Sequence, residues 1–436
     1  MRFTPNTDAV VQEMLESMGL QHIEELFADI PDEVKMDRPL NLPPEMSEME
    51  LKALLAGLAA KNLPAADHPC FLGAGAYDSY IPAALEQLLL RSEFYTSYTP
   101  YQPEISQGIL QAIFEYQTMI CQLTELDVSN ASLYDGATAL AEACTLAAVH
   151  TRKKRVVIPE TVHPEYKKVI ETYALSGYFE PVFVPCPDGV LDLKAASDLV
   201  NDQTAALAVQ HPNFFGHLEP VGAASQLIHQ AGGLLIMAVD PLSLALLKPP
   251  GSWGADIAVG EGQALGNPLS FGGPYLGFMA VTRPLMRKIP GRIVGQTNDL
   301  EGRRGFVLTL QAREQHIRRE KAGSNICSNQ ALNALAAAIY LTLMGPRGLK
   351  QIALRCHQLA VYAQKRLEEA GFPLLYNQPF FREFAVKTPD AGEINRRLLE
   401  KGIIGGLEIE GGMLLAFTEK RSRQEIDQLV AAFKGE

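Results

Sequence analysis

The stretch Leu234–Asp240, with the sequence LLIMAVD, is a run of six apolar residues that ends on a carboxylate. A continuous apolar run of this length is typical of a strand buried on both faces of a parallel sheet. Other short β-rich runs share this character, and helix-length segments separate several of them: Arg155–Ile158, Pro181–Val184, Ala205–Val209, Asp256–Val259 and Leu276–Val281. The alternation predicts an α/β domain with a mostly parallel sheet.

The two ends of the chain follow other patterns. Near the N-terminus, Thr7 is expected to cap a helix, and Ser47 with Glu50 forms the S-x-x-E pattern of a capping box. Near the C-terminus, the run Asn329–Met344 predicts a helix that is stopped by the pair Gly345-Pro346. We therefore expect three parts: a helical N-terminal arm over 1–90, a large α/β domain over 91–325 and a small α+β domain over 326–436.

Composition excludes several classes of function. The 436 residues contain 38 basic and 50 acidic side chains, for a formal net charge of −12, which argues against a nucleic-acid-binding protein. No uncharged apolar run reaches the roughly 20 residues that span a bilayer. The six cysteines are scattered and form no CxxC pair, so we expect reduced thiols, no metal site and a cytoplasmic location.

Motifs for nucleotide binding are absent or weak. The chain has no GxxxxGK[ST] segment, so a P-loop is excluded. The segment Gly260–Gly266, GEGQALG, resembles GxGxxG, but Leu265 stands at the place of the third glycine. The segment also follows the fifth predicted strand instead of the first of a βαβ unit, so it is a weak indicator of dinucleotide binding.

Polar residues near strand and helix ends are better candidates. The segment Asp135–Thr138 (Asp135, Gly136, Ala137 and Thr138) opens an Ala-rich helix, where a phosphate could be held or Asp135 could simply cap the helix. His163 follows the strand predicted at Arg155–Ile158, where a histidine is more often structural than functional. Asp240 lies at the predicted mouth of the sheet, and its alternative role is to cap the turn that follows it.

Together these residues resemble the pocket of a fold-type-I pyridoxal-phosphate (PLP) enzyme, but the Schiff-base lysine is missing. Lys248 follows Asp240 too closely to lie on the next strand, and Lys288 comes after the following strand. Gln263 stands in the segment where the lysine belongs, and an amide cannot form an imine. An ionised Asp135 would also repel a phosphate.

Six long sequence blocks are distinctive: Phe71–Pro82, Phe94–Gln107 (FYTSYTPYQPEISQ), Tyr134–Ala143, Asp240–Pro250, Gly254–Gly277 and Gly305–Leu335. They resemble the glycine dehydrogenase (decarboxylating) family, which supplies the P-protein of the glycine cleavage system. The resemblance implies an aspartate aminotransferase-like, fold-type-I large domain. Within the family the chain is similar to the first, or alpha, subunit of the split form, which assembles with a second subunit as an α2β2 heterotetramer.

The resemblance also implies how the work is divided between the subunits. The lysine motif of the family, H-K-T followed by a glycine-rich stretch, belongs to subunit 2. Counted back from Gly273-Pro274, the lysine falls on Gln263 here. This chain would then carry no catalytic residue, bind no PLP covalently and be inactive alone. The implied vestigial pocket comprises Asp135, Gly136, Ala137, Thr138, His163, Asp240 and Gln263. With PLP on subunit 2, the complex would decarboxylate glycine and pass the aminomethyl group to the lipoyl group of the H-protein.

Two further segments have competing interpretations. Residues of the 94–107 block could line the active site of the partner or pack in an ordinary subunit interface: Tyr95, Tyr98, Tyr101, Gln102 and Glu104. The basic run Arg313–Lys321 is expected to pair with itself on a helix through Glu314/Arg318 and His316/Glu320, and the alternative is a docking surface for an acidic partner such as the H-protein. Two other hypotheses are a free-standing PLP enzyme anchored at Lys248 and a scaffold that only stabilises subunit 2.

Overall fold

The computed structural model describes residues 5–36 and 38–435. Its contacts divide the chain into two compact units, Met1–Leu63 and Pro64–Glu436. The first unit holds helices α1 (Asp8–Ser17) and α2 (Glu48–Ala59). Thr7 Oγ1 accepts the Val10 amide at the start of α1, and Ser47 and Glu50 bond reciprocally at the start of α2, so both predicted caps are confirmed. The division of the chain at residues 90 and 325 stays a prediction.

A seven-stranded sheet organises the second unit, in the order β1-β7-β6-β5-β4-β2-β3. The neighbouring strands β3, β2, β4, β5 and β6 pair in parallel, and β7 is antiparallel to both of its neighbours, β6 and β1. Each of the six predicted runs overlaps one strand, so the mostly parallel sheet is confirmed. The bounds are β1 Val128–Ser129, β2 Arg155–Pro159, β3 Glu180–Val184, β4 Thr204–Gln210, β5 Leu234–Val239, β6 Ile257–Glu261 and β7 Gly277–Val281.

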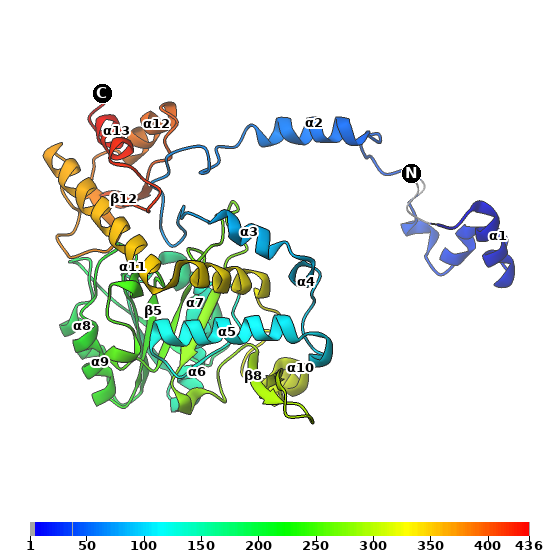
Figure 1. Cartoon of the computed structure of the whole chain (residues 1–436), viewed down its shortest axis with the longest axis horizontal. Coiled ribbons are helices and arrows are strands. Elements are labelled where there is room, and N and C mark those ends of the chain that lie inside the picture. The colour runs from blue at the N-terminus through cyan, green and yellow to red at the C-terminus, as the bar shows by residue number, and fades with distance from the viewer. Residues whose placement is uncertain (1–4, 37, 436) are drawn as a thin grey trace. The chain divides into compact units, whose positions relative to one another are not determined.

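Helices cover both faces of this sheet because its strands are apolar on both sides. In β4, Leu207 and Val209 point into a core shared with α5 and α11, whereas Ala206 and Ala208 face the alanines of α6. Figure 1 shows α5 and the first half of α11 side by side on one face. The helices are α3 Ala83–Leu89, α4 Ser92–Tyr95, α5 Gln107–Thr124, α6 Gly136–Thr151, α7 Pro164–Ala174, α8 Leu193–Leu199, α9 Val221–Gln230 and α10 Gln315–Arg318.

Helix α11 (Ala331–Glu369) consists of two helical segments that meet at a kink. Gly345 adopts the non-helical values φ 58° and ψ 179°, so the predicted stop at Gly345-Pro346 is confirmed, and a second helical segment begins directly after it. Glycine reaches this conformation without strain, and proline is tolerated in the first turn of the new segment, where its missing N–H is not needed. The apolar residues of α11 therefore continue from the core at the large sheet into the core of the C-terminal part.

The C-terminal part packs α12 (Ala391–Glu400) and α13 (Arg423–Lys434) against a small antiparallel sheet. Its strand order is β10-β12-β11, with bounds Glu383–Lys387, Gly412–Ala416 and Leu407–Ile409. A separate hairpin joins β8 (Ile293–Asn298) to β9 (Arg304–Thr309). Strand β10 begins at Glu383, so the charged pair Arg382-Glu383 enters the interior of the unit at the edge of the large sheet.

Within residues 5–36 and 38–435, none of the helices combines the length and the apolar character that crossing a membrane requires. The same residues place no group of three or more His, Cys, Asp or Glu side chains where they could hold a metal ion. All six cysteines are free.

Glu142 gives the fold a pH dependence that can be measured. This α6 side chain is 3% exposed, and burial raises its pKa from 4.5 to about 7. The pKa of Glu142 is higher in the folded state than in the unfolded state, so protonated Glu142 favours folding. This contribution to the free energy of unfolding is fully present below pH 4.5 and is lost as the pH rises through about 7. We expect Glu142→Gln to gain about 3 kcal/mol of unfolding free energy over the wild type across that interval, measured by urea unfolding.

The matched control is Glu115→Gln, which changes an exposed glutamate on α5 in the same way. Its free-energy difference from the wild type, measured over the same pH range, is the baseline for Glu142→Gln. A difference for Glu142→Gln that changes no more with pH than this baseline would contradict the raised pKa.

Candidate functional site

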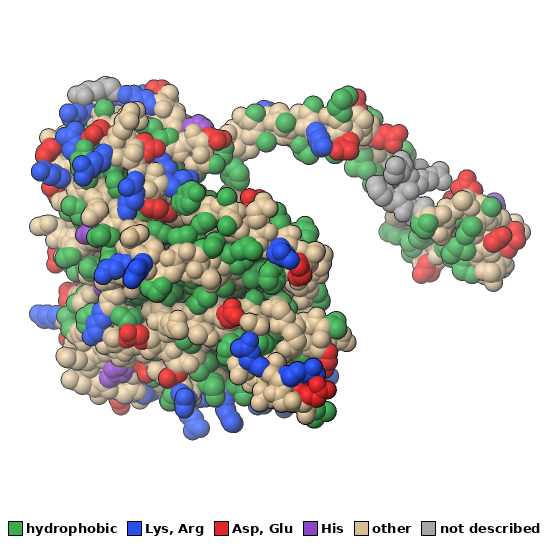
Figure 2. All heavy atoms as spheres, viewed as in Figure 1, with side chains coloured by type: hydrophobic (Ala, Val, Ile, Leu, Met, Phe, Trp, Pro, Cys, Tyr) green, Lys and Arg blue, Asp and Glu red, His purple; other side chains and the backbone are tan. Residues whose placement is uncertain are grey.

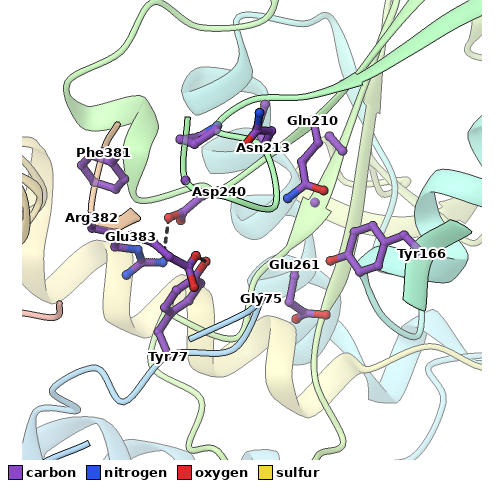
Figure 3. A pocket seen from close by; sticks show the side chains of 15 residues that line it. Gly75, Tyr77, Tyr166, Gln210, Asn213, Asp240, Glu261, Phe381, Arg382 and Glu383 are labelled. Carbon is purple, nitrogen blue, oxygen red and sulfur yellow. Dashed lines mark hydrogen bonds and ion pairs between the residues drawn. The ribbon is translucent and has the colours of Figure 1, made fainter. Parts of the chain in front are cut away.

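A small polar pocket lies at the carboxyl ends of β5 and β6, where parallel sheets commonly bind ligands. Its cavity measures 40 Å³, against about 300–1,000 Å³ for typical ligand pockets. Figure 3 shows Asp240, Glu261, Tyr166 and the pair Arg382-Glu383 converging on it. Most of its space is therefore already filled by side chains of this chain.

The start of α6 is occupied by carboxylates. Asp135 caps the helix, with its Oδ1 accepting the Thr138 amide at 2.8 Å. Glu261 Oε2 accepts the Gly136 amide at 3.0 Å. These are the free N–H groups and the positive dipole end that a phosphate would use. Ala137 follows in the same first turn. Of the two alternatives for this segment, the structure forms the cap.

Glu261 is held firmly where it lies. Its Oε1 accepts the amides of Gln263 and Leu276, at 3.0 and 2.8 Å. Burial raises its pKa to about 7, although the backbone N–H groups that it accepts favour the charged form. The Tyr166 hydroxyl packs directly against Gly136: a Cβ at that position would lie 2.2 Å from it. Little space therefore remains beside the start of α6.

Asp240 is paired instead of free. Its Oδ2 lies 2.7 Å from Nη2 of Arg382, a side chain that is 1% exposed. The contact is an ion pair without hydrogen-bond geometry, and Nε and Nη1 of Arg382 have no partner. Asp240 Oδ1 also accepts the Leu242 amide at 3.0 Å, so the predicted turn cap forms as well. The Arg382 guanidinium lies 3.6 Å from the centre of the Tyr77 ring.

Glu383 links the C-terminal part to the loop at 73–77. It is 3% exposed, and its two oxygens accept the Ala74 amide at 2.6 Å and the Tyr77 hydroxyl at 2.8 Å. Burial raises its pKa to about 7. The loop is thereby fixed across the mouth of the pocket.

Gln263 has its amide group fully engaged and is 1% exposed. Its Nε2 donates to the carbonyls of Tyr77 and Asn267, at 3.0 and 2.7 Å, and its Oε1 accepts the Tyr77 amide at 2.8 Å. The residue at the expected lysine position therefore bridges the 73–77 loop to the turn after β6.

His163 caps α7 and is held on both ring nitrogens. Its Nδ1 accepts the Glu165 amide, and its Nε2 lies 2.8 Å from the Ala74 carbonyl, to which it donates. Its ring stacks on Tyr166 with 4.9 Å between centres. Burial lowers its pKa, which favours the neutral ring that these bonds require.

These residues do not fit a PLP group of their own. A phosphate would meet Asp135 and Glu261, a pyridinium would compete with Arg382 for Asp240, and the anchor position is Gln263. The 15 lining residues include no lysine. Lys248 is exposed and packs 4.1 Å from the Trp253 ring centre, so it is not an alternative anchor within this pocket.

The structure places the other predicted residues elsewhere. Tyr95 ends α4, and Tyr98, Tyr101, Gln102 and Glu104 follow in the exposed loop before α5. None of the five lines the pocket around Asp240. Tyr98 is 84% exposed, so its side chain is available to a neighbouring molecule.

The basic run at 313–321 does not form the self-paired helix that the sequence predicts. Helix α10 covers only Gln315–Arg318, and the backbone turns sharply at Arg319. Glu314 meets His316 at 3.6 Å, and Arg318 Nε donates to the Ala312 carbonyl. The predicted Glu314/Arg318 and His316/Glu320 pairs are wrong because the helix is too short to hold them.

Sequence reasoning did not identify Glu261, Tyr77, Tyr166, Arg382 or Glu383. Glu261 had a local signal, since it is a carboxylate directly after an apolar strand. Arg382 and Glu383 interrupt an otherwise apolar and aromatic segment, PFFREFAV, which indicates buried charge. Their partners lie more than a hundred residues away in the sequence, so the contacts themselves had no local signal.

Known proteins resemble the whole chain. The model of the family described as glycine cleavage system P-protein matches residues 1–433. The chain is 61% identical over 436 residues to "Probable glycine dehydrogenase (decarboxylating) subunit 1" of Syntrophomonas wolfei, covering 100% of both chains. Among solved structures, it superposes on the glycine decarboxylase (P-protein) of the glycine cleavage system in inhibitor-bound form, with a TM-score of 0.93, 44% identity and full coverage of both chains.

A more distant likeness concerns the fold alone. An alanine–glyoxylate aminotransferase from Nostoc sp. is 19% identical and gives a TM-score of 0.60 over 92% of this chain and 99% of its own. The predicted aminotransferase-like α/β fold is confirmed.

Proposed function

Since this chain belongs to the glycine cleavage system P-protein family, we propose that it acts as subunit 1 of glycine dehydrogenase (decarboxylating) without anchoring the cofactor itself. In this proposal, PLP is bound by subunit 2, and the assembled enzyme decarboxylates glycine and transfers the aminomethyl group to the lipoyl group of the H-protein. The chain contributes the fold, part of the interface and part of the wall of the partner's active site.

The observation that carries this proposal is the state of Gln263 and its surroundings. The family match covers residues 1–433, and the position where the lysine is expected lies within it. Gln263 bonds to Tyr77, Glu261 accepts the Gly136 amide, and Arg382 pairs with Asp240, so the groups that a cofactor would use are engaged within the chain. Such a pocket supports a structural role for this chain and supports the proposal that a related partner carries the chemistry.

An α2β2 assembly is the proposed form. Figure 2 shows hydrophobic side chains at the surface over α3, α5 and α11. Exposed large apolar side chains in this part of the chain include Leu88, Leu90, Tyr95, Tyr98, Ile105, Leu332 and Leu343. Exposed apolar surface of this kind is typical of a protein interface, and it continues into the tyrosine loop.

The lipoylated H-protein is the proposed acceptor of the aminomethyl group. Its docking to this chain finds support in a cavity of 260 Å³ near α10, whose lining includes two carboxylates, Glu142 and Glu314, and five cations: Arg287, Lys288, Arg313, Arg318 and Lys321. Cations therefore outnumber carboxylates on its walls. They offer an acidic protein a local attraction that the chain's net charge of −12 does not.

Tyr98 provides the test of a wall-lining role. We expect Tyr98→Ala to lower release of CO2 from glycine by the assembled enzyme by roughly 10-fold while leaving assembly intact, because a positioning contact is lost. Glu104→Gln should behave in the same direction. The control is Tyr178→Ala, which removes another exposed tyrosine, from the turn before β3.

The outcomes separate the competing roles. Turnover and assembly that both survive Tyr98→Ala and Glu104→Gln would favour a scaffold that only stabilises subunit 2. Failure of the wild-type chain to form a complex with a lysine-bearing second chain would contradict the proposed function itself.

A further inference from the structure

Arg292 is a buried cation without an acidic partner in the described part of this chain. It lies on the segment that enters β8 and is 5% exposed. Its Nη1 donates to Asn329 Oδ1 at 3.3 Å and its Nη2 to the Tyr101 hydroxyl at 3.2 Å, and both acceptors are neutral. Its Nε has no hydrogen-bond partner. A buried charge left unpaired is strongly unfavourable, so this arrangement indicates an anion supplied from outside the chain.

The side chain faces a cavity large enough for such an anion. The cavity measures 270 Å³ and is separate from the pocket around Asp240. Among its lining residues Arg292 is the one charged side chain; Ser328, Asn329 and Tyr98 add polar groups, and Phe94 and Leu308 are apolar. With no carboxylate on its walls, the cavity is electrically positive.

The guanidinium is held in place before any ligand binds. The Ala131 amide donates to the Arg292 carbonyl at 2.8 Å, and Asn130 Nδ2 donates to the Pro290 carbonyl at 3.0 Å. Gly291, which lies between Pro290 and Arg292 in the sequence, has φ +76°, and a Cβ there would lie 3.1 Å from Asn130 Nδ2. Asn329 is fixed in turn by a 2.9 Å bond from its Nδ2 to Ser132 Oγ. Such preorganisation is typical of a binding residue.

The open side of the cavity is formed by the loop proposed to face the partner. Tyr95 and Tyr98, which are 65% and 84% exposed, line it together with Pro100. Tyr101 of the same loop accepts from Arg292. A ligand held by the partner chain could therefore place one end against Arg292.

We propose that Arg292 and Asn329 bind the anionic end, a carboxylate or a phosphate, of a small molecule presented by the partner chain. The inference rests on the proposed function, because the assembled enzyme offers two such groups: the carboxylate of glycine and the phosphate of the cofactor. Nε and an Nη of Arg292 form a planar fork that matches either group, with apolar walls around it.

The test compares Arg292→Gln and Arg292→Lys in the assembled complex. If glycine supplies the anion, Arg292→Gln raises KM for glycine by roughly 10-fold or more with a smaller change in kcat. If the cofactor supplies it, the same variant loses bound PLP on dialysis faster than the wild type. Arg292→Lys should restore part of the effect, because it keeps the charge and loses the fork. Unchanged KM and unchanged PLP retention in an intact complex would overturn the proposal.

Two further measurements keep this test independent of the proposed function. Arg304→Gln, on the neighbouring strand of the same hairpin and exposed, is the matched control and should behave as the wild type. Binding of acetate and of inorganic phosphate to the isolated chain, followed by calorimetry, should be lost in Arg292→Gln. If the complex never forms, binding of these anions to the isolated wild-type chain still supports the site. If the isolated wild-type chain does not bind them, the proposed site is overturned.

Discussion

Asp240→Ala is expected to destabilise the purified chain by about 3–5 kcal/mol, because it leaves the Arg382 guanidinium buried without a counter-charge. Arg382 is 1% exposed, and its Nε and Nη1 already lack hydrogen-bond partners, so it cannot turn to water for compensation. Urea unfolding of the wild type and the variant at one pH measures the effect.

The double variant Asp240→Ala/Arg382→Met is the informative control. Replacing both charges by uncharged side chains removes the penalty of the orphaned cation, so it should cost less than Asp240→Ala alone. Asp240→Asn keeps an acceptor for the Leu242 amide and isolates the loss of charge from the loss of the turn cap. A loss below about 1 kcal/mol for Asp240→Ala would show that Asp240 does not hold Arg382 in the folded protein.

Gln263→Lys, the substitution that restores the family's lysine, is expected to produce no covalent adduct with PLP. The new ammonium would replace three hydrogen bonds that join Gln263 to Tyr77 and Asn267, in a pocket of 40 Å³. Asp135 and Glu261 still occupy the N-terminus of α6, where the phosphate would bind. We also expect a stability loss of about 3 kcal/mol, because a charge is buried and hydrogen bonds are lost.

Borohydride reduction in the presence of PLP, followed by mass measurement, checks this expectation. The partner chain that is proposed to carry the lysine, treated in the same way, is the positive control. The triple variant Gln263→Lys/Glu261→Ala/Asp135→Ser removes both carboxylates, and we expect more adduct from it than from the single variant. A stoichiometric adduct on the single variant would mean that the missing lysine alone separates this pocket from a working one.

Local sequence signals determine much of this structure. The run at Leu234–Val239 became β5 with the same bounds, since a buried strand is specified by its own apolar residues. Asp135 and Asp240 were found because carboxylates after strands and at helix starts are visible in sequence. The ion pair of Asp240 with Arg382 was not visible, because the two residues meet only after the C-terminal part folds against the large sheet.

Helix ends show the same limit. Gly345-Pro346 carries a local signal of a helix stop, and the first segment of α11 ends there. The ion pairs predicted in the basic run require a continuous helix, but α10 ends at Arg318. Arg292 gave no signal at all, since its burial and its cavity depend on the 94–101 loop and on α11 together.

We propose that this chain is the member of the complex that does not anchor the cofactor. The most direct measurement is borohydride reduction of the assembled enzyme loaded with PLP, followed by mass determination of each chain separately. We expect a covalent PLP adduct on the partner chain and an unmodified mass for this chain. A PLP adduct on a lysine of this chain, with the partner chain unmodified, would contradict it.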